Sequence, residues 1–448
     1  MRLEQDQTNF NPKDEYAVSF PKFEWLSVQQ RQALNDNAPF YITGPAGCGK
    51  SIVVLWKHIN NIKSNKKSVI LTYNVMLREF MKHCVLKTEG IPANSSHEIL
   101  SLYKELREKP YWKIDNERNI KYCGYNPMCK NNPDQSGFCW CESKFQKYHE
   151  NTYEIIIDEA QDFDVRALEI LARNIRYICI SADFDQQMYG GRIQNENTLL
   201  NLLGYFGKQI NLHHLKEIFR YPLGIYNFVI SVVGKGRDRE TLEYLEEKAQ
   251  NDSLNNRLPL ICDKIPEDRE IEYLIKLLDV EPYKGTNVAI LVPYSIRDRI
   301  KHNGIYQMDN NGNYIFNKQH KSAFCSVEYY VRELKERGAQ CTFYINESDC
   351  KVTGLEYNES DFSKLHICSF KSAKGLEFDT VIIPKFEFID VASNNQLKEY
   401  YVAMTRAKIN LILLTKLDAN DIIKLKNIDS RIYNKTTYEE KSYNETDF

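Results

Sequence analysis

Short apolar runs alternate along the chain with longer segments that carry apolar residues at helical spacing. Runs of strand length, each followed by polar residues, occur at residues 40–43, 68–72, 154–157 and 177–180. The second half repeats the pattern at residues 288–292, 365–368, 380–383 and 409–414. Strands that alternate with helices are typical of a parallel sheet covered by helices. The pattern therefore predicts an α/β protein with two cores, each built on a parallel sheet.

Two helices can be predicted in more detail. Apolar residues share one face of a helix after the first strand; they are Ile52, Leu55, Trp56, Ile59 and Ile62. In the second half, Ser326 can cap a helix that runs to Arg337 and is stopped by Gly338.

Two stretches interrupt the alternation. Residues 86–150 are polar and rich in Lys, Tyr and Cys, and we expect a small insertion in the first sheet. Residues 303–325 include the turn sequence Asp309-Asn-Asn-Gly312 between aromatic residues, which predicts a hairpin-like insertion in the second. The tail after Lys416 is polar, and we expect it to be frayed. The expected domains are a first core at residues 1–85 and 151–213, a Cys-containing insertion at residues 86–150, and a second core at residues 214–448.

Composition narrows the class of protein. With 448 residues, the chain is too long for one compact core. A hydrophobic fraction of 42% and a charged fraction of 27% exclude a mainly disordered or fibrous chain. No apolar run approaches the roughly 18 residues that a membrane span needs, and the first residues carry no apolar signal region. We therefore expect a soluble cytoplasmic protein with no membrane partner.

The charge balance and the cysteines limit the binding sites. Lys and Arg number 59 against 61 Asp and Glu, so the net charge is −2 and a general positive surface is excluded. A nucleic-acid site must then be a local groove. The 12 cysteines, in a chain without an export signal, are expected to be reduced thiols for the most part.

A glycine-rich loop follows the first predicted strand. It matches the pattern G-x-x-x-x-G-K-[ST] with Gly44, Pro45, Ala46, Gly47, Cys48, Gly49, Lys50 and Ser51. Backbone N–H groups of such a loop surround phosphates, and the dipole of the following helix adds to their attraction. Lys50 would reach the β- and γ-phosphates, and the Ser51 hydroxyl would bind Mg²⁺. A strand before the loop and a helix after it favour a nucleoside triphosphate site over a chance glycine turn.

Asp158 and Glu159 follow the strand at residues 154–157. An acidic residue at a strand end suits a second Mg²⁺ contact, and its neighbour can orient or deprotonate the attacking water. A charged strand end on its own is often only a solvated loop. Together with the glycine-rich loop, this pair predicts nucleotide hydrolysis.

Further motifs occur in a fixed order. They are LSVQQRQAL at residues 26–34, ADFDQQMY at 182–189, LKEIFRYP at 215–222, SFKSAKGLEF at 369–378 and YVAMTRA at 401–407. With the two sites above, they resemble the motif series of superfamily 1 helicases of the UvrD/Rep/PcrA-like branch, from about residue 26 to 415. The sequence Lys374-Gly-Leu-Glu377-Phe is more similar to this branch than to the RecD/Pif-like branch.

The resemblance implies two RecA-like P-loop NTPase cores, with ATP in the cleft between them and single-stranded DNA across their tops. Gln30 would bind the adenine edge, and Gln186 would link the γ-phosphate to the nucleic acid. Arg220 and Arg406 resemble two arginines that the second core brings to the γ-phosphate. Gly375 and Glu377 resemble a pair that meets phosphate and ribose. The residues that would contact nucleic acid are Thr72, Tyr73, Asn74, Tyr189, Ser369 and Lys371.

The chain departs from the family in its insertions. Only about 84 residues separate Asn74 from Asp158 (158 − 74), and about 149 separate Arg220 from Ser369 (369 − 220). Little is left for the accessory subdomain that UvrD-like enzymes carry, and Lys371 stands where many relatives carry His. The short insertions argue against processive unwinding of a duplex, but they do not argue against ATP-driven movement along a strand.

Four cysteines cluster in the first insertion: Cys123, Cys129, Cys139 and Cys141, with His149 beyond them. They supply enough thiolates for a tetrahedral Zn²⁺ site, but the spacing suits reduced thiols equally well. Nearby, Pro133-Asp134 and Glu142-Ser-Lys144 match a nuclease-like pattern, which in so short a loop is best explained as accidental.

The sequence therefore predicts an ATP-dependent DNA helicase or translocase, an ATP hydrolase that uses Mg²⁺ and moves 3′ to 5′ on single-stranded DNA. RNA stays open as the substrate. The alternative is a nucleic-acid-gated ATPase switch that regulates a partner protein such as a nuclease, for example in phage defence. A further alternative is strand degradation through Glu142 and Lys144.

Overall fold

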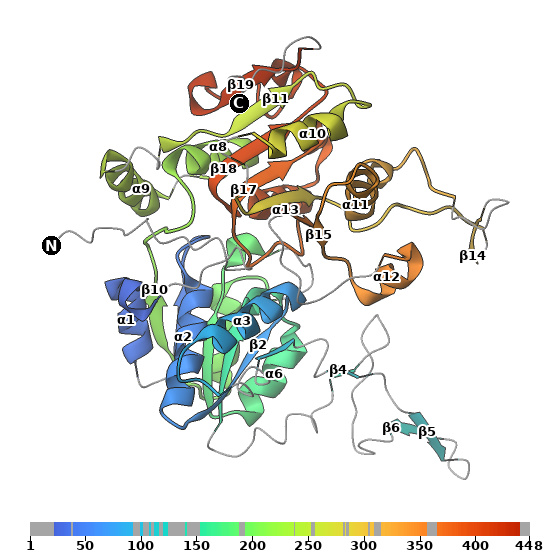
Figure 1. The fold of residues 1–448 in the computed structure, drawn as a ribbon. Coiled ribbons are helices and arrows are strands. Elements are labelled where there is room, and N and C mark those ends of the chain that lie inside the picture. Colours follow the sequence, from blue (N-terminus) through green and yellow to red (C-terminus); the bar gives the residue numbers. More distant parts are fainter. Residues whose placement is uncertain are drawn as a thin grey trace. The chain divides into compact units, whose positions relative to one another are not determined.

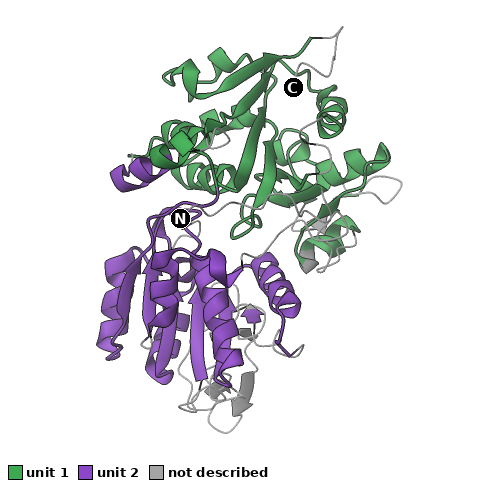
Figure 2. Ribbon diagram, turned by 60° about the vertical axis from the view of Figure 1, so that its left-hand side comes forward, with its two compact units in different colours: residues 1–19, 221–237, 246–448 green, residues 20–220, 238–245 purple. Residues whose placement is uncertain are grey.

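The structure, a computed structural model, contains two compact units (Figures 1 and 2). The N-terminal core (purple in Figure 2) comprises Phe20–Arg220 and Asp238–Leu245, and the C-terminal core (green) comprises Tyr221–Arg237 and Glu246–Phe448. This division falls after Arg220, whereas we expected it after residue 213. The structure describes residues 22–36, 39–92, 99–101, 107–108, 112–115, 120–123, 139–140, 153–187, 193–236, 238–251, 256–280, 283, 286–302, 305–308, 315–355 and 365–439.

The N-terminal core is built on a six-stranded parallel sheet with strand order β10-β1-β9-β8-β2-β3. Its strands are β1 (Phe40–Thr43), β2 (Lys67–Thr72), β3 (Ile99–Ser101), β8 (Tyr153–Asp158), β9 (Tyr177–Ser181) and β10 (Asn211–His214). The strands predicted at residues 40–43, 68–72, 154–157 and 177–180 are confirmed. The two edge strands, β3 and β10, were not predicted.

Helices cover both faces of this sheet. They are α1 (Val28–Asn35), α2 (Lys50–Lys63), α3 (Val75–Lys87), α6 (Val165–Asn174) and α7 (Glu196–Tyr205). Successive strand residues point to opposite faces: Ile156 packs with α1, α2 and α3, whereas Ile155 and Ile157 pack with α6 and α7. Both faces are thus apolar, which is why the strands appear in the sequence as continuous apolar runs.

In the first insertion the structure describes two short antiparallel pairs. β4 (Arg107–Glu108) pairs with β7 (Cys139–Trp140), and β5 (Trp112–Asp115) pairs with β6 (Ile120–Cys123).

The C-terminal core is built on a seven-stranded parallel sheet with strand order β15-β16-β12-β17-β18-β11-β19. Its strands are β11 (Leu260–Asp263), β12 (Val288–Val292), β15 (Thr342–Phe343), β16 (Leu365–Ser369), β17 (Phe378–Ile383), β18 (Ala407–Leu414) and β19 (Asn434–Thr437). Its helices are α8 (Leu223–Val233), α10 (Glu270–Leu278), α11 (Val327–Glu336), α12 (Glu347–Thr353) and α13 (Asn394–Met404), and α9 (Arg239–Asn251) follows α8.

The four strands predicted in this half are confirmed. Ser326 caps α11 as predicted, because its hydroxyl accepts from the Tyr329 N–H.

The expectation of a frayed tail after Lys416 is wrong. Ile422 and Leu425 are buried, and β19 pairs in parallel with β11 at the edge of the sheet. A polar sequence such as Asn434–Thr437 suits an edge strand, because its backbone forms the ladder while its side chains meet water.

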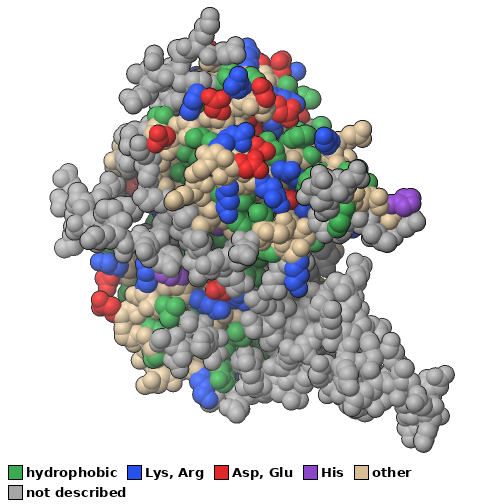
Figure 3. Space-filling model, turned by 45° about the vertical axis from the view of Figure 1, so that its right-hand side comes forward, with side chains coloured by type: hydrophobic (Ala, Val, Ile, Leu, Met, Phe, Trp, Pro, Cys, Tyr) green, Lys and Arg blue, Asp and Glu red, His purple; other side chains and the backbone are tan. Residues whose placement is uncertain are grey.

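The distribution of charged side chains and the lengths of the helices agree with the composition of the chain. On the face drawn in Figure 3, Lys and Arg side chains lie among Asp and Glu side chains, as a net charge of −2 suggests. Within the described part of the chain, no helix is both long enough and apolar enough to cross a membrane.

Candidate functional site

The glycine-rich loop connects β1 to α2 as the sequence predicts. Gly47 and Gly49 have φ values of +80° and +85°, in the left-handed region that favours glycine. A Cβ on Gly49 would lie 2.3 Å from the Gln30 Nε2 atom. Glycine is therefore required there both by the backbone conformation and by the close approach of Gln30.

Gln30 lies against the loop from α1. Its Oε1 accepts from the Ser27 N–H at 3.0 Å, and its Nε2 donates to the Cys48 carbonyl at 3.0 Å. The side chain thus joins the start of α1 to the loop backbone. Its predicted contact with adenine stays a prediction.

Lys50 is buried at the start of α2. Its Nζ donates to the carbonyls of Gly44 at 2.7 Å and Pro45 at 3.0 Å, and to Asp183 Oδ2 at 3.2 Å. Burial alone would lower the pKa of Lys50, but the neighbouring acidic groups, Asp183 first among them, together outweigh burial and raise it above its ordinary value. Lys50 is therefore a fixed positive charge beside the loop. Burial also raises the pKa of the Cys48 thiol, which stays protonated.

Asp158 ends β8 and is fully buried. Its Oδ1 accepts from the Ser181 hydroxyl and from the Glu159 N–H, whereas its Oδ2 has no hydrogen-bond partner among the described residues. Burial, and secondly the charge of Glu159, raise the pKa of Asp158 to about 6, while Ser181, then Ser51 and Lys50, favour its ionised form. A buried carboxylate oxygen without a partner, close to a serine hydroxyl, fits a Mg²⁺ ion, which prefers oxygen ligands.

Next to Asp158, a network of hydrogen-bonded polar side chains begins at Glu159. The Glu159 carboxylate accepts from Gln161 Nε2, and Gln161 Oε1 accepts from the Asp183 N–H at 3.0 Å. Asp183 Oδ2 accepts from both Lys50 Nζ and Gln186 Nε2. Asp183 therefore joins Lys50, Gln186 and the Glu159 turn. Asp183 and Gln161 were not predicted as site residues, although Asp183 lies in the motif at residues 182–189 and Gln161 follows Glu159 by two residues.

Arg220 belongs to the N-terminal core, not to the second core as expected. The segment that leads to it runs along the glycine-rich loop, where the Leu215 N–H donates to the Thr43 carbonyl and the Phe219 N–H donates to the Gly47 carbonyl. The charge of Arg220 acts on the Cys48 thiol. The structure thus brings Arg220 close to the loop within a single core.

Arg406 is 1% exposed in the C-terminal core, so it is not a surface cation. Its Nε donates to the Val402 carbonyl at 2.9 Å and its Nη1 to the Leu376 carbonyl at 3.3 Å. Leu376 lies between Gly375, whose φ is +82°, and Glu377. Three predicted site residues of this core therefore lie together.

The residues predicted to bind nucleic acid lie at strand ends. Thr72 ends β2, and its hydroxyl accepts from the Asn74 N–H, while Asn74 caps α3 through the Met76 N–H. Tyr73 is partly buried against the core of the same unit. Ser369 ends β16, and its hydroxyl lies 2.8 Å from that of Ser372. Tyr189 lies outside the described residues.

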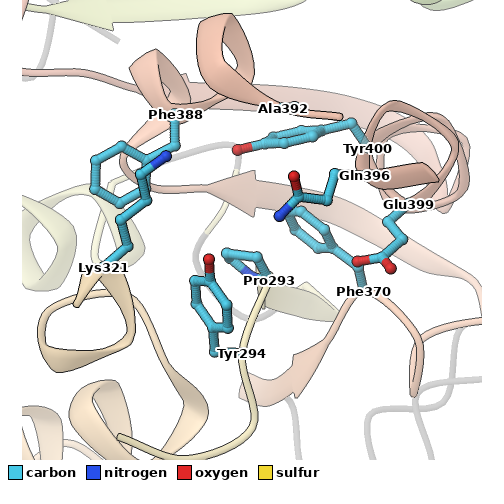
Figure 4. A pocket seen from close by; sticks show the side chains of 9 residues that line it. All are labelled: Pro293, Tyr294, Lys321, Phe370, Phe388, Ala392, Gln396, Glu399 and Tyr400. Carbon is cyan, nitrogen blue, oxygen red and sulfur yellow. The ribbon is translucent and has the colours of Figure 1, made fainter. Parts of the chain in front are cut away.

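Lys371 is exposed and forms an ion pair with Glu399, with 3.2 Å between Nζ and Oε1. Glu399 lines a pocket at the ends of β12 and β16 (Figure 4). The pocket combines aromatic with polar side chains, and its lining residues are Pro293, Tyr294, Lys321, Phe370, Phe388, Ala392, Gln396, Glu399 and Tyr400. Sequence reasoning missed this pocket because its residues come from separate segments that share no motif.

The zinc hypothesis concerns residues that the structure describes only in part. The side chains of Cys123 and Cys139 are not described, and Cys129 and Cys141 lie outside the described residues together with His149, Pro133, Asp134, Glu142 and Lys144. In the rest of the chain that the structure covers, no group of His, Cys, Asp and Glu is arranged to hold a metal ion. The cysteines whose side chains are described are free thiols.

Two family models match the chain. An AAA domain matches residues 29–192, which contain the glycine-rich loop, Asp158 and Gln186. A UvrD-like helicase C-terminal domain matches residues 345–417, which contain Ser369, Lys371 and Arg406. Curated proteins give no match.

Several solved structures resemble the chain at low identity. The C-terminal domain of a possible DNA helicase from Lactobacillus plantarum has 16% identity and a TM-score of 0.30, covering 48% of this chain and 98% of that chain. Bacteroides Pif1 bound to single-stranded DNA has 12% identity and a TM-score of 0.36, covering 86% and 92%. Saccharomyces cerevisiae Dbp5 bound to RNA has 11% identity and a TM-score of 0.44, covering 91% and 89%. At these values the solved structures add no argument about function.

The two family matches cover most of the predicted motifs of both parallel-sheet cores, whereas the segment at residues 215–222 lies in neither match. The chain has two RecA-like cores, and over its matched residues it is similar to UvrD-like superfamily 1 helicases.

Proposed function

We propose that the chain hydrolyses ATP and uses the energy to move along single-stranded DNA. The observation that carries this proposal is the arrangement of Lys50 and the unpartnered Oδ2 of Asp158 at one sheet edge. A triphosphate with Mg²⁺ requires both groups, because the ammonium attracts the phosphates and the carboxylate binds the metal ion.

Different residues of the N-terminal core would bind the phosphates, bind Mg²⁺ and activate the attacking water. Backbone N–H groups of the loop and Lys50 would hold the phosphates, and Ser51 with Asp158 would hold Mg²⁺, which neutralises developing charge when bound. Glu159 would orient and deprotonate the attacking water, because it follows Asp158 directly and is held by Gln161. This assignment rests on position and chemistry together.

The remaining family roles are proposals of the same kind. Gln30 would favour ATP over other nucleotides, and Gln186 would respond to the γ-phosphate. Arg220 and Arg406 would stabilise the transition-state charge, a role that the planar guanidinium performs better than an ammonium. Gly375 and Glu377 would meet phosphate and ribose beside Arg406.

For the nucleic acid, the supporting observation is the position of its predicted contacts at strand ends. Thr72, Tyr73 and Asn74 follow β2, and Ser369 and Lys371 follow β16. Ligands of α/β sheets bind at the carboxyl ends of the strands. We propose travel from 3′ to 5′, with DNA as substrate and RNA as the alternative.

The central experiment measures ATP hydrolysis with and without single-stranded DNA or RNA, with Glu159→Gln as the inactive control. Directional travel is then measured by displacement of streptavidin from biotin at either end of the strand. We expect stimulation by single strands, and displacement only from the 5′ end. A chain whose hydrolysis does not respond to any single strand would contradict the proposal.

Unwinding needs a separate measurement. The short insertions support weak strand separation by the chain alone, with rescue by a partner protein such as a nuclease. Strand displacement on a long duplex, with and without proteins that co-purify with the chain, tests this. Processive unwinding by the isolated chain would disprove it.

The cysteine cluster of the first insertion carries a separate hypothesis, a zinc site. If Cys123, Cys129, Cys139 and Cys141 bind Zn²⁺, metal analysis should find close to one zinc per chain, and Cys139→Ser should lose it. Zinc-free protein would identify the four cysteines as reduced thiols.

A further inference from the structure

The segment between β12 and α11 forms an arm on the C-terminal core. We define the basic arm by its described residues, 295–302, 305–308 and 315–325. In the sequence, residues 295–325 contain five Lys and Arg but only two Asp and no Glu, a net charge of +3 (5 − 2) in a chain whose total is −2. In Figure 1 the arm extends from α11 to β14.

The root of the basic arm is fixed by buried polar contacts. The Arg299 guanidinium donates to both carboxylate oxygens of Glu328 at 2.9 and 3.1 Å, and both side chains are buried. Glu328 also accepts from the Arg297 N–H at 3.0 Å, and Ser322 Oγ accepts from the Asp298 N–H at 2.7 Å. A charged pair that is both buried and hydrogen-bonded holds its two segments in one register. The arm therefore has a defined base.

Beyond the root the arm is a small ribbon. β13 (Lys301–His302) pairs antiparallel with β14 (Ile305–Tyr306). The Ile300 N–H donates to the Ile315 carbonyl, and the Ile315 N–H donates to the Gln307 carbonyl. Three backbone segments are thus joined by hydrogen bonds into one ribbon.

Some basic residues of the arm make contacts within the core, and others are exposed to solvent. Arg299 is used at the root, and Arg297 packs over the rings of Phe316 and Tyr329 at 5.0 and 5.3 Å. Lys301 and Lys318 are exposed instead. The basic arm also exposes His302 and His320 together with the apolar residues Ile300 (44%), Met308 (52%) and Ile315 (39%).

The arm leaves the sheet beside the residues that we propose bind nucleic acid. β12 pairs with β16 so that Val292 lies opposite Ser369, and the Phe370 N–H donates to the Val292 carbonyl. Tyr294, directly before the arm, and Lys321, in its last segment, line the same pocket as Phe370 (Figure 4). The base of the arm and the Ser369 turn are therefore neighbours within one core.

We propose that the basic arm binds the phosphate backbone of duplex nucleic acid next to the single strand on which the motor acts. Arg299 bridges to Phe316, so the segments that carry the exposed side chains of Lys301 and Lys318 lie side by side at the root. Two exposed ammonium groups on one arm can each contact a phosphate, which is the sequence-independent contact that duplex nucleic acid offers. The position beside Ser369 favours nucleic acid over an acidic protein surface.

This inference rests on the proposed function, and the test separates the two. The test variant is Lys301→Glu with Lys318→Glu. The matched control is Lys351→Glu with Lys426→Glu, which makes the same charge change at exposed positions of the same core outside the arm. Binding to a single strand and to a single-strand–duplex junction is measured without nucleotide over a range of salt, and stimulated ATP hydrolysis is measured on the single strand.

We expect the test variant to bind the junction roughly tenfold more weakly or worse, and to lower the slope of log K against log salt by about 2. Binding to the single strand and stimulated hydrolysis should match the control. Junction binding equal to that of the control would overturn the inference, as would an equal loss on single strand and junction. Failure of the proposed function would instead appear as an unaltered chain whose hydrolysis does not respond to single strands.

Discussion

Lys50 and Asp183 form a buried ion pair in the N-terminal core, with 3.2 Å between Nζ and Oδ2 and side chains that are 7% and 6% exposed. The ammonium has three protons, and it donates to Gly44, Pro45 and Asp183. A phosphate that binds Lys50 must therefore displace one of these acceptors. Repulsion between two anions favours the displacement of Asp183, so Asp183 competes with the nucleotide for Lys50.

We predict that Asp183→Asn binds ADP several-fold more tightly than the unaltered chain, because a neutral amide holds an ammonium less strongly than a carboxylate does. Isothermal titration calorimetry measures the change. The control is Asp185→Asn, an exposed carboxylate on the same turn. Unchanged or weaker binding by Asp183→Asn would show that the ion pair does not oppose the nucleotide.

Lys50→Ala and Glu159→Gln should both abolish ATP turnover, but for different reasons. Lys50→Ala removes the charge that holds the phosphates, so nucleotide binding should fall too. Glu159→Gln should still bind ATP, because Ser51 and Asp158 keep their Mg²⁺ ligands. Parallel hydrolysis and binding assays distinguish the two, and normal turnover in either variant would refute the assignment.

Acid should weaken the response to Mg²⁺. The pKa of Asp158 is raised to about 6, first by burial and then by Glu159, so the ionised carboxylate predominates above that pH and the protonated form below it. Because a proton and Mg²⁺ compete for the same oxygen, the Mg²⁺ concentration for half-maximal hydrolysis should rise several-fold between about pH 7.5 and pH 5.5. Mg²⁺ titrations at both pH values, corrected for Mg²⁺ binding by free ATP, measure this. Equal requirements would contradict the prediction.

Arg406→Ala should destabilise the C-terminal core, because the carbonyls of Val402 and Leu376 lose a buried donor. The cost should be about 1–3 kcal/mol, visible as a melting temperature lowered by several degrees. Arg431→Ala is the control, since its side chain is 87% exposed. Arg406→Lys should keep more of the stability yet lose stimulated hydrolysis by roughly 10³-fold, as expected when an arginine acts on the transferring phosphate. Normal stimulated hydrolysis in Arg406→Lys would leave Arg406 only a structural role.

Sequence reasoning found most of the central strands because both of their faces are buried, which leaves continuous apolar runs such as Val288–Val292. It did not identify the short internal strand β11. It missed β10 and β19, which lie at sheet edges and whose mostly exposed sequences, Asn211–His214 and Asn434–Thr437, carry little apolar signal. An edge strand is selected by its backbone hydrogen bonds, which leave no trace in hydrophobic patterning.

In the candidate site, too, some features could be predicted from the sequence and others could not. The glycine-rich loop and Asp158 could be predicted, because their chemistry requires fixed residue types at fixed spacing. The role of Asp183 as a shared acceptor for Lys50 and Gln186 could not, because it depends on side chains that meet only after β1 and β9 pair. The pocket beside Glu399 was hidden for the same reason.

The pairing of β19 with β11 has a consequence for solubility. The family resemblance ends at residue 417, yet the sheet continues to Thr437, and the polar strand Asn434–Thr437 covers the backbone edge of the apolar strand Leu260–Asp263. A protein cut at the end of the resemblance would expose that apolar edge as a template for pairing with other chains. Residues 418–437 therefore protect the C-terminal core against aggregation, although they carry none of its motifs.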